Sequence, residues 1–251
     1  MCHSDISRPP LPPIRGAASD QGPLDLTASD GNRLLAYVAR PAKPSGRGMV
    51  VMPDVRGLHE FYKDLARRFA EAGFEAIAID YFGRTASTED RSEAFDWMTH
   101  VKQLTPEGTA SDVRAAVEHL RSEAGGKSEA IFTVGFCMGG RASWRQSAEG
   151  HGLAGAIGFY GGQPLSLEPV IPKLEAPLLL LLAGQDQATP ADDFRKFEKL
   201  LRQAGVEYES HTYPDAPHSF FDRSFKEHAA ACEDAWRRIL DFTGRLTPAA
   251  A

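Results

Sequence analysis

The chain has 251 residues, 42% of them hydrophobic and 25% charged, a balance typical of a globular protein with one sizeable core. Its formal net charge is -6 and it has no basic run, so we expect no nucleic acid and no anionic membrane surface as a partner. The longest wholly apolar stretch, 177–183, is too short to span a bilayer.

The first segment, residues 1–22, is rich in Pro, Ser and Arg, so we expect an N-terminal arm without regular structure. A single domain is expected to follow over 23–246. Cys2 and His3 are adjacent metal-binding side chains, but two neighbouring ligands in a mobile arm make a poor site. We therefore expect no bound metal.

Beyond the arm, short apolar runs alternate with longer amphipathic segments. Apolar residues recur at helical spacing in 60–72, where Gly73 ends the predicted helix, and Ser111 is the expected N-cap of another helix. Strands are predicted at 34–39, 47–52, 74–80, 130–135, 153–160, 177–183 and 208–213, and helices at 60–72, 111–122, 141–148, 191–204 and 228–245. This alternation predicts an α/β fold with a mostly parallel sheet covered on both faces.

Cysteine usage bears on the compartment. Cys2, Cys137 and Cys232 lie far apart in the sequence, which does not indicate a disulfide framework and fits a reducing interior. No basic segment followed by an apolar block begins the chain, so no secretory signal is visible. We therefore expect a cytoplasmic protein.

The strongest motif follows the predicted strand at 130–135, where residues 135–140 read GFCMGG. This is G-x-C-x-G, a nucleophile elbow with cysteine in place of the usual serine. The turn exposes the sulfur of Cys137 at the start of the next helix, whose dipole favours the thiolate. The backbone amide of Met138 is left free to bind an oxyanion. The alternative is a buried cysteine beside a glycine-rich turn.

The other members of a triad follow in the order nucleophile, acid, histidine. Asp186 comes directly after the apolar run at 177–183, and His218 lies in the loop PDAPHSF after a predicted strand. His218 can serve Cys137 as a base while Asp186 orients its ring. A second oxyanion donor is expected from the loop after 47–52, where the amide of Val55 is the candidate. The acids that compete with Asp186 are Asp192, Asp193 and Asp215.

Five segments together resemble the dienelactone hydrolase family (carboxymethylenebutenolidases) of α/β-hydrolases. They read VMPDVRGLHEFYKDLARRFAEAGFEAIAIDYFGR, VGFCMGG, AIGFYGG, LLAGQD and PDAPHSF. The resemblance runs from about residue 34 to 245, and its most specific piece is the cysteine elbow. It implies hydrolysis of an enol-lactone through a thioester, without a cofactor. It also implies an acid that activates the thiol, at the position of Asp54, where the family has glutamate.

The resemblance also bears on substrate binding. The family holds a substrate carboxylate with two arginines, and Arg91 lies where the first is expected. The second position, four residues after His218, is Asp222. A carboxylate facing the pocket disfavours an anionic substrate, so a neutral or differently shaped ester is expected. Three aromatic residues are expected to line the pocket: Trp97, Tyr160 and Phe220.

The favoured function is hydrolysis of a small carboxylic ester or lactone through Cys137, His218 and Asp186. One alternative is a non-catalytic module that keeps the hydrolase shell to hold a small molecule. Another is a redox-sensing thiol at Cys137, although no resolving cysteine lies nearby in the sequence. The expected partner is a small-molecule substrate, and the expected state is a monomer or a small homo-oligomer.

Overall fold

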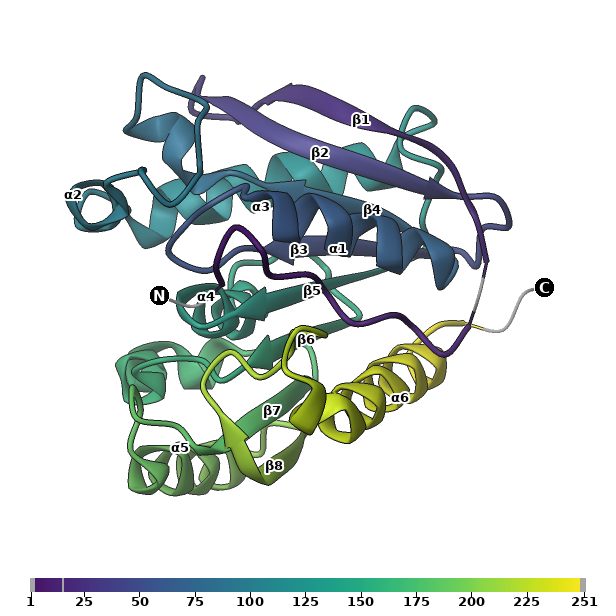
Figure 1. Ribbon diagram of the computed structural model, residues 1–251. Coiled ribbons are helices and arrows are strands. Elements are labelled where there is room, and N and C mark those ends of the chain that lie inside the picture. The colour runs from purple at the N-terminus through teal and green to yellow at the C-terminus, as the bar shows by residue number, and fades with distance from the viewer. Residues whose placement is uncertain (1–2, 15, 249–251) are drawn as a thin grey trace.

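The described part of the chain, residues 3–14 and 16–248 of the computed structural model, contains one eight-stranded sheet. The strand order is β1-β2-β4-β3-β5-β6-β7-β8, from the top to the bottom of Figure 1. β1, β2 and β4 pair antiparallel, and every later pair is parallel. The strands are β1 (Ala18–Thr27), β2 (Arg33–Pro41), β3 (Arg47–Met52), β4 (Phe74–Ile79), β5 (Ala130–Phe136), β6 (Gly155–Phe159), β7 (Leu178–Gln185) and β8 (Tyr208–Pro217).

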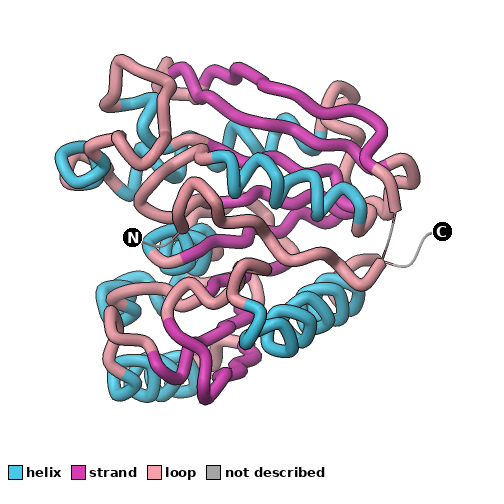
Figure 2. Tube along the Cα trace, viewed as in Figure 1, coloured by secondary structure: helices cyan, strands magenta, loops and turns pink. Residues whose placement is uncertain are grey.

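Helices cover both faces of this sheet, as Figures 1 and 2 show. α1 and α6 pack on one face, whereas α3, α4 and α5 pack on the other. The α-helices are α1 (Glu60–Glu71), α2 (Trp97–Val101), α3 (Pro106–Arg121), α4 (Met138–Gln146), α5 (Ala191–Gln203) and α6 (Ala229–Arg245). Three 3-10 segments are η1 (Tyr81–Arg84), η2 (Pro164–Lys173) and η3 (Lys226–His228). No helix in the described residues is long and apolar enough to cross a membrane.

The central strands have continuous apolar sequences rather than alternating ones, and their burial explains this pattern. Every residue of β4, β5 and β6 is buried, because helices cover both sides of the strand. The parallel register places Met52 of β3 opposite Gly135 of β5, and Phe136 opposite Phe159 of β6. The loops after these strands therefore meet at one edge of the sheet.

The predicted α/β class and the seven predicted strands are confirmed, but the prediction missed α2 and placed the start of α4 three residues late, and it also differs from the structure at β1 and α3. An edge strand, β1, begins at Ala18, inside the segment expected to lack regular structure. α3 begins at Pro106 rather than near Ser111, and its N-cap is Thr105, whose Oγ1 accepts from the Gly108 amide at 3.1 Å. The first turn of α3 has no apolar periodicity, so the sequence pattern indicates the helix only from the second turn onwards.

Candidate active site

The elbow carries Cys137 in a strained conformation between β5 and α4. Its φ of 56° and ψ of -117° are unfavourable for a residue with a Cβ, and such strain persists only where the surroundings impose it. The carbonyl of Phe159 accepts from the Cys137 amide at 3.1 Å, which ties the turn to β6. A Cβ at Gly135 would collide with the carbonyl of Gly139, so only glycine allows this close approach. Cys137 is partly exposed.

The histidine and the acid meet as the sequence predicts. His218 Nδ1 lies 2.8 Å from Asp186 Oδ2, and the Asp186 side chain is almost fully buried. The other oxygen, Asp186 Oδ1, accepts from the amides of Ala188 at 2.7 Å and Thr189 at 3.2 Å. The carboxylate is thus fixed by its own loop. Nδ1 is thus the His218 nitrogen that faces Asp186, and Nε2 is the ring nitrogen on the side away from this carboxylate.

Two backbone positions are the predicted oxyanion donors. Met138 is the first residue of α4, so its amide is one of those that a helix leaves without an intrahelical partner. Val55 follows β3 in the turn 53–57, next to the elbow in the parallel register. The same turn holds Asp54, which is fully buried. Asp54 Oδ1 accepts from the Arg56 amide at 2.9 Å, whereas Oδ2 has no hydrogen-bond partner among the described residues.

The N-terminal arm, defined here as residues 3–14, crosses the sheet face between α1 and α6 (Figure 1). It contains no helix or strand, yet it is packed against the domain. The His3 ring is buried and stacks on Phe61 of α1 with the centroids 3.8 Å apart. At the other end, the indole of Trp236 on α6 donates to the carbonyl of Pro10 at 3.2 Å. Cys2 lies outside the described residues.

The arm is bonded to the turn that carries Val55. The buried guanidinium of Arg56 donates to the His3 carbonyl and, at 2.6 Å, to Asp5 Oδ1. His59 Nε2 lies 2.9 Å from the same oxygen. Hydrogen bonds from Arg56 and then His59 lower the pKa of Asp5 to about 2. The carboxylate is therefore charged at neutral pH and holds the arm to this turn.

The arm is also bonded to the loop that carries His218, through Asp222. Asp222 is fully buried, and its Oδ1 accepts from the amides of Arg8 at 3.1 Å and Ser224 at 2.9 Å, while Oδ2 lies 3.7 Å from His3 Nδ1. Burial raises the pKa of Asp222, but the hydrogen bonds outweigh it and hold the pKa well below its usual range. The expectation that Asp222 faces the substrate is wrong, because this carboxylate anchors the arm.

The four residues expected to bind substrate lie in different surroundings. Tyr160 and Phe220 are fully buried, and the Tyr160 ring packs on His218 with the centroids 4.8 Å apart. Trp97 is the first residue of α2 and half-buried against the core under α3. The structure thus brings two of the four next to the predicted histidine, while Trp97 lies outside that group.

Arg91 is buried in an ion pair rather than free in a cleft. Its Nη2 lies 2.7 Å from Asp80 Oδ2, and its Nε donates to Asp80 Oδ1 at 3.2 Å. Nη1 donates to the carbonyls of Thr88 and Asp90, and the guanidinium covers the ring of Phe95. Its donors are thus occupied by Asp80 and by two carbonyls of its own loop.

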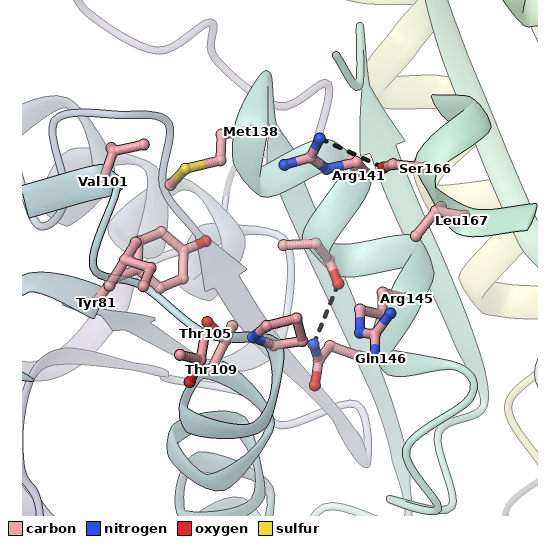
Figure 3. Close-up of a pocket in the computed structure, with 13 residues that line it drawn as sticks. Tyr81, Val101, Thr105, Thr109, Met138, Arg141, Arg145, Gln146, Ser166 and Leu167 are labelled. Atoms are coloured by element: carbon pink, nitrogen blue, oxygen red, sulfur yellow. Dashed lines mark hydrogen bonds between the residues drawn. The ribbon is translucent and has the colours of Figure 1, made fainter. Parts of the chain in front are cut away.

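Sequence reasoning missed a pocket of about 320 Å³ beside α4 (Figure 3). Met138, Arg141 and Arg145 line it from α4, and Tyr81 lines it from the segment after β4. The helical spacing of these α4 residues downstream of the elbow was the available signal. The Tyr81 hydroxyl donates to the carbonyl of Pro53 at 3.1 Å, which joins the pocket wall to the turn that carries Val55.

In the described part of the chain, no group of three or more His, Cys, Asp or Glu side chains is arranged to hold a metal ion. A mostly parallel sheet between two layers of helices, with a sharp strand-to-helix turn that bears a cysteine at the carboxyl end of β5, defines the class of protein as an α/β-hydrolase.

The family follows from comparison with known proteins. Residues 34–247 match the model of the dienelactone hydrolase family, and this chain belongs to that family. It is therefore a dienelactone hydrolase-like ester hydrolase.

Individual relatives agree with this placement. A protein of Escherichia coli strain K12, provisionally named carboxymethylenebutenolidase, is 32% identical over 228 residues, which cover 85% of this chain and 83% of the relative. A Bradyrhizobium protein, assigned with reservation as a 2-oxo-3-(5-oxofuran-2-ylidene)propanoate lactonase, is 29% identical over 84% of this chain and 89% of its own length. The crystal structure of a provisionally assigned dienelactone hydrolase from Klebsiella pneumoniae has a TM-score of 0.73 at 30% identity, covering 90% of this chain and 100% of that one.

Proposed function

We propose that this protein hydrolyses a small carboxylic ester or lactone with Cys137 as the nucleophile, His218 as the base and Asp186 as the residue that orients it. One observation carries the proposal: a cysteine held at positive φ on the elbow, at the sheet edge where the 2.8 Å contact of His218 with Asp186 also lies. A cysteine with a merely structural role does not require a strained turn at the start of a helix.

The reaction proceeds through a thioester. The Cys137 thiolate adds to the substrate carbonyl, and the amides of Met138 and Val55 bind the oxyanion. The oxyanion collapses, the bond to the leaving oxygen breaks, and protonated His218 gives that oxygen a proton. Neutral His218 then takes a proton from water, and the resulting hydroxide adds to the thioester. Breakage of the carbon–sulfur bond releases the acid and restores the thiolate, while Asp186 stabilises charged His218.

We assign activation of the thiol to Asp54. In the β3–β5 register, Asp54 lies two residues beyond Met52 and Cys137 two residues beyond Gly135, so both follow paired strand positions. The buried Asp54 Oδ2, which lacks a hydrogen-bond partner among the described residues, is a suitable first acceptor for the thiol proton. This proton then passes to His218, so that His218 is protonated when the bond to the leaving oxygen breaks. Asp54→Asn is expected to slow formation of the acyl-enzyme while leaving its hydrolysis unaffected, as rapid-quench measurements with 4-nitrophenyl acetate would show.

Hydrolysis of 4-nitrophenyl acetate, with intact-mass analysis of the protein, tests the main proposal. Cys137→Ala is expected to abolish turnover, and His218→Gln is expected to accumulate an acetylated protein whose label maps to Cys137. Cys232→Ala is the matched control, because this buried cysteine belongs to α6, packs in the core and takes no part in the proposed reaction. Wild-type activity in the Cys137→Ala variant would disprove the assignment.

A further inference from the structure

The pocket beside α4 has walls suited to the body of a small organic molecule. Its volume of about 320 Å³ lies within the range of small-molecule sites. Figure 3 shows it between Tyr81 and Val101 on one side and α4 with the η2 segment on the other. The apolar part of its lining consists of Val101, Leu104, Pro106, Met138, Ala142 and Leu167.

All the charged side chains that line this pocket are positive. Two arginines, Arg141 and Arg145, line it, and none of its thirteen lining residues is acidic. Arg145 Nε lies 3.0 Å from Glu149 Oε1, so its charge has a partner in the turn that follows α4. Arg141 Nη1 instead donates to two neutral groups, Gln163 Oε1 at 2.8 Å and Ser166 Oγ at 3.4 Å.

Arg141 therefore carries charge that no carboxylate neutralises among the described residues. Burial lowers the pKa of Arg141, which reflects the cost of keeping its charge, while the nearby Cys137 opposes the shift. An anionic partner stabilises such a half-buried guanidinium, because its oxygens replace the water lost on burial. Its planar fork can bind both oxygens of a carboxylate.

The pocket lies next to the elbow. The Arg141 amide donates to the carbonyl of Cys137 at 3.3 Å, so Arg141 lies one helical turn beyond the nucleophile. Side chains on a helix lean towards its N-terminus, which directs Arg141 back towards the elbow. Met138 belongs to both places, because its amide is an oxyanion donor in the proposed mechanism and its side chain lines the pocket. A substrate carbonyl at Cys137 thus has the pocket within reach.

The two positions where the family resemblance implies substrate arginines are engaged elsewhere in this chain. Arg91 is buried against Asp80, and the second position is Asp222, which holds the arm. The arm also occupies the α1 side of the site. The α4 side, with Arg141, is the side that offers both space and positive charge.

We propose that this pocket holds the distal end of a substrate that bears a carboxylate, an anionic ester or lactone acid, and that Arg141 binds the carboxylate. The inference rests on the proposed function of Cys137. It reverses the expectation of a neutral substrate, since the carboxylate that motivated that expectation, Asp222, does not face the site.

Two 4-nitrophenyl esters of similar length test this proposal: the glutarate monoester, which is anionic, and the valerate, which is neutral. The measured quantity is the ratio of their kcat/KM values. Arg141→Gln is expected to lower this ratio by about 10- to 100-fold, the usual effect of removing one charged hydrogen-bonding partner. Arg141→Lys is expected to restore part of it, because charge remains but the fork is lost.

Arg237→Gln is the matched control, because it removes an equal charge from the exposed face of α6. Its ratio is expected to equal that of the wild type. The proposal is overturned if Arg141→Gln leaves the ratio within about twofold of this control, or if both esters lose activity equally, since Arg141 would then be structural.

Binding of glutarate to the Cys137→Ala variant, measured by calorimetry, separates this proposal from the proposed function. Binding that disappears with an added Arg141→Gln change supports the pocket even if the nucleophile is misassigned. If the wild type hydrolyses both esters but Cys137→Ala binds no glutarate, the proposed carboxylate site is overturned and the proposed triad is not affected.

Discussion

At the scale of single residues, the site is held by groups that take no part in bond making. Two backbone amides fix Asp186 Oδ1, and the other oxygen meets His218. The His218 ring in turn packs on Tyr160, itself held at a φ of 36° at the end of β6. Imidazole orientation is thus determined by a hydrogen bond on one side and a ring contact on another.

This arrangement predicts the effect of Asp186→Asn. The amide retains an acceptor for the loop amides but removes the charge that stabilises protonated His218, so kcat should fall roughly 100- to 10,000-fold. The decrease in kcat should exceed any rise in KM, as steady-state kinetics with 4-nitrophenyl acetate would show. Asp192→Asn, on the exposed start of α5, is the control. A fall of less than about threefold would remove Asp186 from the triad.

Two of the three cysteines are predicted to differ in alkylation by iodoacetamide. Cys232 is buried, its thiol donates to the carbonyl of Phe220 at 3.3 Å, and burial raises its pKa to about 12. It should stay unmodified in the folded protein, whereas the partly exposed Cys137 should react and activity should be lost in parallel. Peptide mapping measures both sites, and unfolding in urea should make them react alike. Modification of Cys232 first would contradict this prediction.

At the scale of elements, the arm is bonded to two loops of the candidate site, and we expect it to hold them in place. One attachment, Asp5 with Arg56, lies beside Val55, and the other, Arg8 with Asp222, lies four residues after His218. The arm also spans from α1 to α6, which pack against opposite halves of the sheet (Figure 1).

Asp5→Ala is expected to loosen the arm at the turn that carries Val55. The peptide amides of 3–14 and 53–58 should exchange with deuterium faster, and kcat/KM should fall by up to roughly tenfold, a part of the full effect of an oxyanion donor. Asp25→Ala removes a comparable surface carboxylate on β1 and serves as the control. Unchanged exchange in 53–58 would show that the arm does not position this turn.

The elements show what the sequence can and cannot predict. The central strands and the elbow follow from local patterns, because buried apolar runs and a glycine-flanked nucleophile carry their own signal. β1 does not, since its residues are mostly exposed and include Gly22 and Pro23, both unusual inside strands. Its pairing with β2 supplies the structure that its composition lacks.

The residues of the candidate site also fall into those that the sequence predicts and those that it does not. The order of Cys137, Asp186 and His218 is visible in the sequence because strand order places all three at one sheet edge. The partners of Arg91 and Asp222 depend on which segments fold against them, and the arm that binds Asp222 comes from more than 200 residues away. Composition alone indicated a free arm, since hydrogen bonds to buried groups elsewhere leave no local pattern.

At the scale of the whole molecule, acid is expected to destabilise the fold through a buried histidine. His151 follows α4, and its Nε2 lies 2.9 Å from Gln146 Oε1. Burial, together with the positive charges of Arg114 and Arg121, lowers the pKa of His151 to about 4. Both arginines donate to carbonyls flanking it, those of Glu149 and Gly152, so they stay close.

The direction of this pH effect follows from the difference in proton binding between the unfolded and the folded protein. Between pH 6.5 and pH 4 the unfolded chain protonates His151 while the folded protein does not, so the free energy of unfolding should fall with falling pH, by up to about 1.4 kcal/mol per unit from this group. Other histidines, such as His59, also have lowered pKa values and add to the slope. His151→Gln removes one titration, so urea unfolding across this range should give a shallower decline than in the wild type. If the free energy of unfolding falls with equal slope in the wild type and in His151→Gln, then His151 is protonated in the folded protein, whatever the absolute stability of the variant.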